Sequence, residues 1–276
     1  MADPELRAEM VDEIARPRQS VVAALDALAL GPGTRVLDVG CGAGPHLGLF
    51  AGRIAPGGAV VGLDSSAERL ALAAELWADQ LAAGTIALRA GDGCALPFDA
   101  ATFDLAWSSA VLHHIERPGD FLAEQARVVR PGGHVAVLDA DAAGSFPCIP
   151  WPPDLEHRAR AAAWAALAAD FDGALPYHFA GYVGRQLPRL LREAGLRAVR
   201  LHAVNDVDRA PLDPRREEGL RRWFVRWFEE RLRDFLPPRD GRRFLALFDP
   251  ASPDYLLASP DFFQVRTYYL AAGMVP

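Results

Sequence analysis

The sequence contains no lysine, so all 29 of its lysine and arginine positions are arginine. This absence excludes a P-loop nucleotide site and a Schiff-base site for pyridoxal phosphate, because both need a lysine amine. Basic residues form no continuous run, and 36 acidic residues bring the net charge to −7. A nucleic-acid partner is therefore not expected, since neutralisation of phosphates dominates such binding.

Cysteine is also scarce. The three cysteines, Cys41, Cys94 and Cys148, form no C-x-x-C spacing, which favours a reducing compartment and predicts no structural metal site. No apolar run reaches the roughly 20 residues of a membrane span, and the first residues lack the apolar part of a signal peptide. We therefore expect a cytoplasmic protein without a membrane partner.

The most informative segment is VLDVGCGAGP at residues 36–45. Its apolar residues predict a strand buried on both faces of a parallel sheet. Gly40, Gly42 and Gly44 lack a Cβ atom, so the backbone can turn sharply and approach a ligand. Pro45 is expected at the first position of the following helix. The glycine spacing differs from the G-x-G-x-x-G of dinucleotide folds, which disfavours a nicotinamide-dependent reductase.

Acidic residues mark the ends of three predicted strands. Asp38 lies just before the glycine turn, Asp64 ends a strand at residues 59–63, and Asp92 follows a strand at residues 85–90. Ligands of open α/β sheets bind at the carboxyl ends of strands, and a carboxylate can accept hydrogen bonds from both ribose hydroxyls. The alternatives are structural: a helix N-cap for Asp64 and a turn cap for Asp92.

Five motifs resemble, in their order, those of class I S-adenosylmethionine (SAM)-dependent methyltransferases. They resemble most the ubiquinone/menaquinone-biosynthesis C-methyltransferase group, with methyltransferase domains of types 11 and 25. The motifs are VLDVGCGAG, VVGLDSS, GDGCALPF, FDLAWSSAVLHHI and VVRPGGHVAVLD, within residues 34–138. The resemblance implies a Rossmann-like α/β fold whose seven-stranded mixed sheet ends in an antiparallel strand at residues 262–274. It also implies SAM as cofactor and S-adenosylhomocysteine as product.

The resemblance further implies which residues bind the cofactor. They are Asp38, Gly40, Cys41, Gly42, Gly44, Asp64, Ser65, Asp92, Gly93 and Ser108. Asp64 is implied for the ribose and Asp92 for the adenine N6 atom. Asp38 is expected to orient the glycine turn or to contact the ammonium group of the cofactor through water.

Three histidines are candidates for a general base: His113, His114 and His178. Histidine is the side chain that most readily exchanges a proton near neutral pH. His113 and His114 are adjacent and are expected to point in different directions, and a packing or capping role is the alternative for each. Asp139 and Asp141 follow the fifth strand and are further candidates. The spacing of the histidines matches no recognised metal site.

The helical pattern divides the chain into a core and additions. A helical cap at residues 1–33 precedes a SAM-binding core at 34–205, which carries an insert at about 141–182. A helical insert at 206–260 precedes the last core strand at 261–276. Within it, Leu220, Trp223, Phe224, Trp227 and Phe228 share one helical face. This face predicts a helix packed on the core, with a substrate lid or a dimer contact as alternatives. For the inserts as a whole, we expect that their helices form a lid over the substrate.

We expect an enzyme that transfers a methyl group from SAM to an O, N or C atom of a small molecule. A secondary metabolite or a quinone-like compound fits the aromatic and proline-rich inserts. The alternative is a SAM-binding protein that does not methylate, such as a lyase, a pericyclase-like catalyst or a sensing module. The sequence leaves open whether the protein forms a homodimer.

Overall fold

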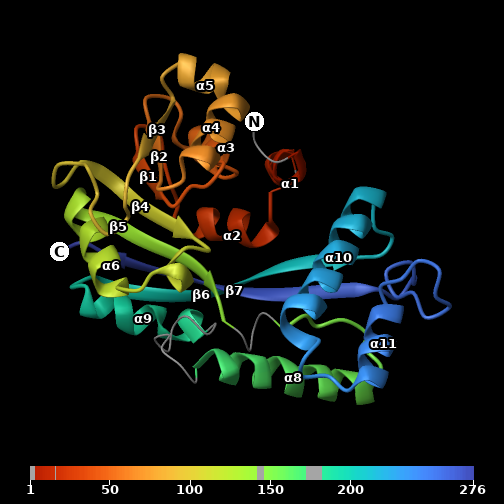
Figure 1. Cartoon of the computed structure of the whole chain (residues 1–276). Coiled ribbons are helices and arrows are strands. Elements are labelled where there is room, and N and C mark those ends of the chain that lie inside the picture. Colours follow the sequence, from red (N-terminus) through yellow and green to blue (C-terminus); the bar gives the residue numbers. More distant parts are fainter. Residues whose placement is uncertain (1–3, 16, 142–145, 172–181) are drawn as a thin grey trace. The chain divides into compact units, whose positions relative to one another are not determined.

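The computed structural model describes residues 4–15, 17–141, 146–171 and 182–276. The chain folds into two compact units. Unit 1 comprises Met1–Asp141, Tyr182–Val204 and Tyr268–Pro276, and unit 2 comprises Ala142–Gly181 and Asn205–Thr267 (Figure 1). Unit 2 therefore consists of two segments that are far apart in the sequence.

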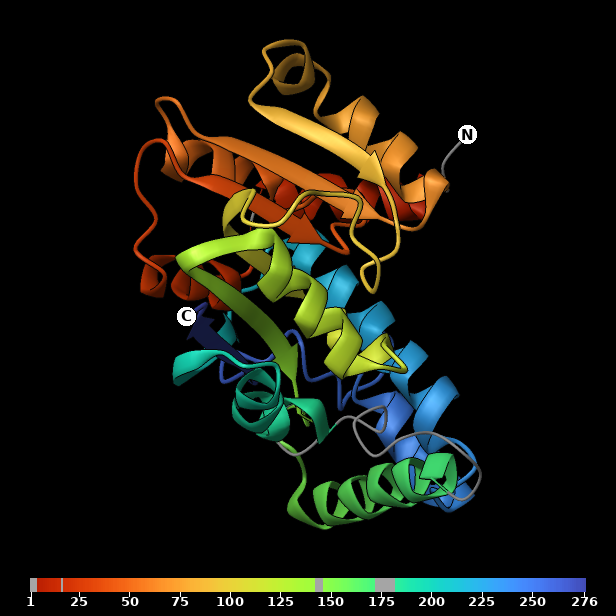
Figure 2. The ribbon, with the colours of Figure 1, turned by 90° about the vertical axis from the view of Figure 1, so that its left-hand side faces the viewer.

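Seven strands of the described residues form one mixed sheet in the order β3-β2-β1-β4-β5-β7-β6. They are β1 (Arg35–Val39), β2 (Ala59–Asp64), β3 (Ile86–Ala90), β4 (Phe103–Ser109), β5 (Val129–Ala140), β6 (Arg197–Arg209) and β7 (Phe263–Met274). Strands β1 to β5 pair in parallel, and β7 runs antiparallel to β5. Figure 2 shows β1, β2 and β3 side by side. The expected Rossmann-like mixed sheet with an antiparallel last strand is confirmed.

The helices of unit 1 cover both faces of its part of the sheet. They are α1 (Pro4–Ala15), α2 (Gln19–Ala27), α3 (Leu47–Ile54), α4 (Ala67–Leu76), α5 (Ala78–Ala82), the 3-10 helix η1 (Leu112–His114), α6 (Pro118–Val128) and α9 (Val183–Glu193). Successive strand residues point to opposite faces, so the fully buried Val36 and Leu37 of β1 belong to different clusters. Both faces of β1 are thus covered, as the apolar run predicts.

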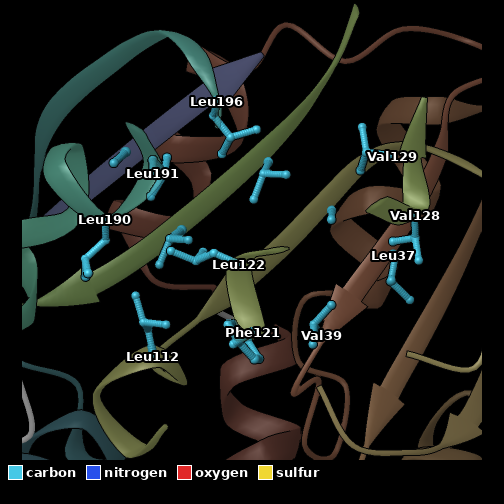
Figure 3. Packing of buried hydrophobic residues seen from close by; sticks show 14 of the residues in the cluster. Leu37, Val39, Leu112, Phe121, Leu122, Val128, Val129, Leu190, Leu191 and Leu196 are labelled. Carbon is cyan, nitrogen blue, oxygen red and sulfur yellow. The ribbon is translucent and has the colours of Figure 1, made fainter. Parts of the chain in front are cut away.

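The cluster around Leu37 joins the sheet to α6 and α9. Phe121 and Leu122 of α6 and Leu191 of α9 are buried in it together with Val39 of β1. Figure 3 shows these side chains converging between the helices and the sheet. Burying each such side chain stabilises the fold by about 1.5–3 kcal/mol, so this packing fixes the carboxyl ends of the strands.

One local expectation, the start of α3, differs from the structure. The helical cap near the N-terminus consists of two helices, α1 and α2, and Pro17 lies between them, where its ring disfavours a continuous helix. Pro45 is in a turn, and α3 begins only at Leu47, because the turn after Gly44 is longer than expected. Strand β5 begins at Val129, because this residue already pairs with β4 before the register shift and the pairing continues after it.

Unit 2 is built around aromatic rings. Its helices are α8 (Pro153–Phe171), α10 (Pro214–Trp227), the π-helical turn η3 (Phe228–Leu232) and α11 (Pro238–Ala246). Leu220, Phe224 and Phe228 of the predicted apolar face are buried. The ring of Phe224 stacks on that of Phe248 at 3.9 Å between centroids. None of the described helices combines the length and the apolar character that crossing a bilayer requires.

Candidate functional site

The glycine turn after β1 has an unusual backbone. Gly40, Gly42 and Gly44 have φ values of +75°, +57° and +77°, a region that glycine adopts without strain. The carbonyl oxygen of Leu63 accepts hydrogen bonds from the backbone N–H groups of Gly40 at 2.7 Å and Cys41 at 3.0 Å. The turn is thereby fixed to the end of β2.

The three glycines of the turn have different surroundings. A Cβ atom on Gly40 would lie 2.5 Å from Cγ2 of Val111, and one on Gly44 would lie 2.6 Å from Cδ1 of Leu47. A Cβ atom on Gly42 would meet no described atom within 4 Å. Gly40 and Gly44 are therefore packed against protein, whereas Gly42 borders the space from which a ligand can approach the backbone.

Asp64 holds the turn from the neighbouring strand. Its side chain is buried, Oδ2 accepts a hydrogen bond from the N–H of Gly42 at 2.8 Å, and Oδ1 accepts one from the N–H of Ser66 at 2.8 Å. Ser66, not Asp64, is the N-cap of α4, since its Oγ accepts from the N–H of Arg69. The alternative N-cap role of Asp64 is therefore wrong. Each carboxylate oxygen keeps a further lone pair for a ligand.

Asp38 is a buried carboxyl group that forms no ion pair with any residue that the structure describes. It is 2% exposed, and Oδ2 has no hydrogen-bond partner among the described residues. Burial and the charge of Asp64 raise the pKa of Asp38 to about 8. Buried polar atoms are normally paired, so an orphaned carboxyl oxygen at a strand end favours a bound donor or cation.

Two other predicted site residues are buried beside these strand ends. Ser108 of β4 is fully buried, and its Oγ has no partner in the described part of the chain. The thiol of Cys41 is buried, and burial, Asp38 and Asp64 raise its pKa. Cys41 is therefore a packing residue of the turn rather than a nucleophile.

The residues after β2 and β3 are more open. Ser65 and Asp92 are exposed. Oδ1 of Asp92 accepts a hydrogen bond from the N–H of Cys94 at 2.8 Å, which is the turn-capping contact proposed as the alternative for this residue. A Cβ atom on Gly93 would lie 2.5 Å from the ring of Phe121, so only glycine fits there. Adenine recognition by Asp92 stays a prediction.

The two adjacent histidines are the last two residues of η1. Their ring centroids are 3.9 Å apart, so the prediction that they point apart is wrong, because the 3-10 turn is tighter than the helical turn assumed. Nδ1 of His113 lies 2.7 Å from Oδ1 of Asp139. Burial opposes protonation of His113, but the hydrogen bond and charge of Asp139 outweigh it and raise the His113 pKa. His178 lies outside the described residues.

Asp141, the other acidic candidate after β5, has a different partner. Nε and Nη2 of Arg185 donate to its two carboxylate oxygens at 2.8 and 2.5 Å. This bidentate pair joins the end of β5 to the first turn of α9. Within the described ranges no three His, Cys, Asp or Glu side chains converge as a metal site would require.

One contact to the glycine turn has no signal in the sequence. Trp77 lies between α4 and α5, and its Nε1 donates a hydrogen bond of 2.9 Å to the carbonyl oxygen of Gly44. The two residues are 33 positions apart, and Trp77 belongs to no motif. Only the folded arrangement identifies this tryptophan as a support of the turn.

Comparisons with known proteins agree with this geometry. A methyltransferase domain model matches residues 37–137. An uncharacterized 37.1 kDa protein in transposon TN4556 of Streptomyces fradiae is 30% identical over 96% of this chain and 69% of its own length. The demethylmenaquinone methyltransferase of a Parafrankia strain is 36% identical over 49% of this chain and 63% of its own length. The chain belongs to the class I SAM-dependent methyltransferases.

Other members of the family match a smaller part of the chain. The nocamycin O-methyltransferase of Saccharothrix syringae is 37% identical over 41% of this chain and 40% of its own length. The chain thus spans less than two thirds of both named methyltransferases. This family's cofactor is SAM, and the matched residues 37–137 include the glycine turn and its two buried carboxyl groups.

Solved structures share the fold. A SAM-dependent methyltransferase from Aquifex aeolicus superposes with a TM-score of 0.54 at 21% identity, covering 74% of this chain and 94% of that one. The [4+2]-cyclase SpnF superposes with a TM-score of 0.51 at 22% identity, covering 93% of this chain and 81% of that one. At these identities the likeness shows the fold alone.

Proposed function

We propose that this methyltransferase transfers the methyl group of SAM to an O, N or C atom of a small molecule. A secondary metabolite or a quinone-like compound is the expected acceptor class. The observation that carries the proposal is the turn after β1, where Gly42 borders open space and Oδ2 of the buried Asp38 lacks a partner. The names of the matched relatives support it, since one is an O-methyltransferase and one acts on demethylmenaquinone.

The residues present fit this cofactor. Gly42 offers its backbone, Asp64 the hydroxyl acceptors for a ribose, and Asp38 a carboxyl group for an ammonium group. Ser65, Asp92, Gly93 and Ser108 complete the predicted set with Gly40, Cys41 and Gly44. SAM supplies an electrophilic methyl group on a sulfonium. The contribution of the protein is then mainly positioning, which can lower a barrier by roughly 7–11 kcal/mol.

The alternative is a SAM-binding protein that does not methylate. The likeness to a [4+2]-cyclase makes this a specific possibility, because one fold hosts several reactions. Cofactor binding would be the same in both cases, so a transfer experiment with labelled methyl SAM separates them. Label in an acceptor supports the methyltransferase, whereas SAM binding without label transfer to any acceptor of a broad panel favours the alternative.

Calorimetric titration with SAM and S-adenosylhomocysteine tests the cofactor site. Asp64→Ala is expected to weaken binding by about 1.5–3 kcal/mol, or roughly 10- to 150-fold in Kd, the scale of hydrogen bonds to a charged group. Asp64→Asn keeps the shape of the side chain and separates the loss of charge from the loss of support for the N–H of Gly42. Absence of binding by the folded wild-type protein would refute the proposal.

A matched control exists at the opposite end of the sheet. Oδ2 of Asp104 accepts a hydrogen bond of 2.7 Å from the N–H of Arg35, at the amino ends of β4 and β1. Asp104→Ala removes a carboxylate that supports a backbone N–H, as Asp64→Ala does, but away from the glycine turn. It is expected to lower stability without changing the Kd for S-adenosylhomocysteine.

A lid or dimer-contact role of the inserts at 141–182 and 206–260 stays a prediction, as do the division into cap, core and last strand and the cytoplasmic location. The second insert and all but the end residues of the first lie in unit 2.

A further inference from the structure

The pair formed by His113 and Asp139 lies at the carboxyl ends of two parallel strands. Ser109 of β4 is in register with Leu138 of β5, so the residues that follow each strand meet at the same edge. Val111, two residues before His113, is the side chain that a Cβ atom on Gly40 would strike. The pair is therefore close to the glycine turn and belongs to unit 1 throughout.

Asp139 determines which nitrogen of His113 carries a proton. Its carboxylate is fully buried and accepts from His113 twice, from the ring Nδ1 at 2.7 Å and from the backbone N–H at 3.3 Å. The N–H of Ala140 also donates to Oδ1 at 2.7 Å. An ionised carboxylate is only an acceptor, so Nδ1 carries the hydrogen and Nε2 carries the lone pair.

Nε2 of His113 is available to another molecule. The side chain is 29% exposed, and no described residue forms a hydrogen bond with Nε2. The charged and titratable groups that act on the two rings are Asp139 of β5, the neighbouring histidine and Arg69 of α4. Burial, His113 and Arg69 lower the pKa of His114, although Asp139 raises it. The pKa values of the two rings are thus shifted in opposite directions, and His113 binds a proton more readily than His114.

We propose that His113 is the general base of the reaction, that Asp139 positions it, and that the acceptor is a hydroxyl or an acidic C–H group rather than an amine. An amine that is already neutral attacks with its own lone pair and needs no base beforehand, whereas a hydroxyl gains nucleophilicity by losing its proton. This inference rests on the proposed methyl transfer. The inference goes beyond the proposed methyl transfer, because it names the residue that takes the acceptor's proton and the chemical class of the acceptor.

The proton and electrons balance as follows. Nε2 of His113 takes the proton of the acceptor O–H or C–H bond, and the electron pair of that bond forms the new bond to the methyl carbon. The methyl–sulfur bond breaks, and its electron pair neutralises the sulfonium. The imidazolium of His113, stabilised by Asp139, later releases the proton to water.

The assignment of the two nitrogens can be tested without cofactor or acceptor. In ¹⁵N-labelled protein, the imidazole nitrogens of the seven histidines are followed by NMR from pH 5 to 9, with His113→Gln and His134→Gln for assignment. We expect the neutral His113 to carry its hydrogen on Nδ1 and to titrate above the usual value near 6.5. Asp139→Asn should shift that midpoint downward, and the control Asp104→Asn should leave it unchanged.

A neutral His113 with its hydrogen on Nε2, or a midpoint that Asp139→Asn does not move, would overturn the proposal. If Asp139→Asn does not fold, the tautomer in the wild-type protein decides by itself, because only a lone pair on Nε2 can take the proton.

The class of acceptor is tested with two probes that share one ring system, 1-naphthol and 1-naphthylamine, whose aromatic amino group is neutral at pH 7. Each is added to the complex with S-adenosylhomocysteine, and the Nε2 resonance of His113 is recorded. The naphthol should shift this resonance in the wild-type protein and not in Asp139→Asn, and the amine should leave it in place. A response to the amine alone, or to neither probe, would refute the acceptor assignment, whereas the S-adenosylhomocysteine titration itself reports separately on the cofactor site.

Discussion

Two buried aspartates, one in each unit, differ in their surroundings. Asp240 of unit 2 is 3% exposed, and Nη1 of Arg158 donates to both of its carboxylate oxygens at 2.8 and 2.9 Å. Hydrogen bonds from Arg158 and Arg243 hold the pKa of Asp240 below its usual value. Asp38 of unit 1 is as deeply buried, no arginine of the described residues pairs with it, and its pKa is raised.

The difference separates structural carboxyl groups from functional ones. A buried carboxylate that is paired within the fold stabilises a particular arrangement of helices. A buried carboxyl group without a partner is destabilising, and it persists where a ligand completes it. The buried charge of Asp240 is therefore satisfied within the fold, whereas we propose that Asp38 is completed by a ligand. Four tests can break or sharpen this comparison.

The largest effect is expected in the aromatic core of unit 2. Phe224 is fully buried and contacts the rings of Trp151, Trp223 and Phe248. Phe224→Ala should lower the free energy of unfolding by about 3–5 kcal/mol, because it removes a buried ring and leaves a cavity. Chemical denaturation measures the loss, and Phe235→Ala, at a ring that is 40% exposed, should lose far less. An equally large loss at the exposed position would contradict the assignment of the core.

The second variant, Asp38→Asn, should act in the opposite direction. Since the folded pKa of Asp38 is raised above its unfolded value of 3.8, the folded protein loses stability as the pH rises from about 4 to about 8. The amide cannot ionise, so the variant should be more stable than wild type by roughly 2–4 kcal/mol at pH 7. Thermal unfolding should show this difference disappearing near pH 4. Binding of S-adenosylhomocysteine should weaken at the same time, and stabilisation without weaker binding would remove Asp38 from the cofactor site.

Much of the fold of unit 1 could be predicted, because the sequence signals for its elements are local. The buried strands, the glycine turn and the acidic strand ends each occupy a few consecutive residues, and the sheet order then places them at one edge. The predicted start of α3 at Pro45 was wrong, because a proline favours the start of a helix but does not determine it. In the structure, Pro45 lies inside the turn. The roles of the predicted cofactor residues stay predictions.

What could not be predicted depends on contacts between distant segments. His113 and Asp139 are 26 positions apart and meet only because of the register between β4 and β5. The apolar face at Leu220 and Phe224 is recognisable as a helix, but its partners at Trp151 and Phe248 come from other segments. Periodicity shows that a face is buried and does not show what it is buried against.

The third test compares two glycines of one turn. Gly44→Ala should destabilise unit 1 by roughly 2–4 kcal/mol, because its Cβ atom would overlap Leu47 in addition to the strain of a positive φ. Gly42→Ala should cost only about 1–2 kcal/mol, since its Cβ atom points into open space. Chemical denaturation measures the loss of stability in each variant, and titration measures the loss of affinity for S-adenosylhomocysteine. Relative to its loss of stability, Gly42→Ala should lose more affinity than Gly44→Ala. The reverse ranking would mean that the ligand does not approach Gly42.

The smallest effect is expected for two tryptophans that make the same contact in different units. Nε1 of Trp77 donates to the carbonyl oxygen of Gly44 at 2.9 Å, and Nε1 of Trp151 donates to that of Pro147 at 3.0 Å. Replacing either by phenylalanine removes one buried hydrogen bond, worth about 0.5–1.5 kcal/mol, and leaves an aromatic ring in place. Both variants should therefore lose similar stability. Only Trp77→Phe should also weaken S-adenosylhomocysteine binding, by a few fold, because Gly44 belongs to the turn that we propose binds the cofactor. Equal loss of affinity in Trp151→Phe would show that the binding site depends on unit 2 as well.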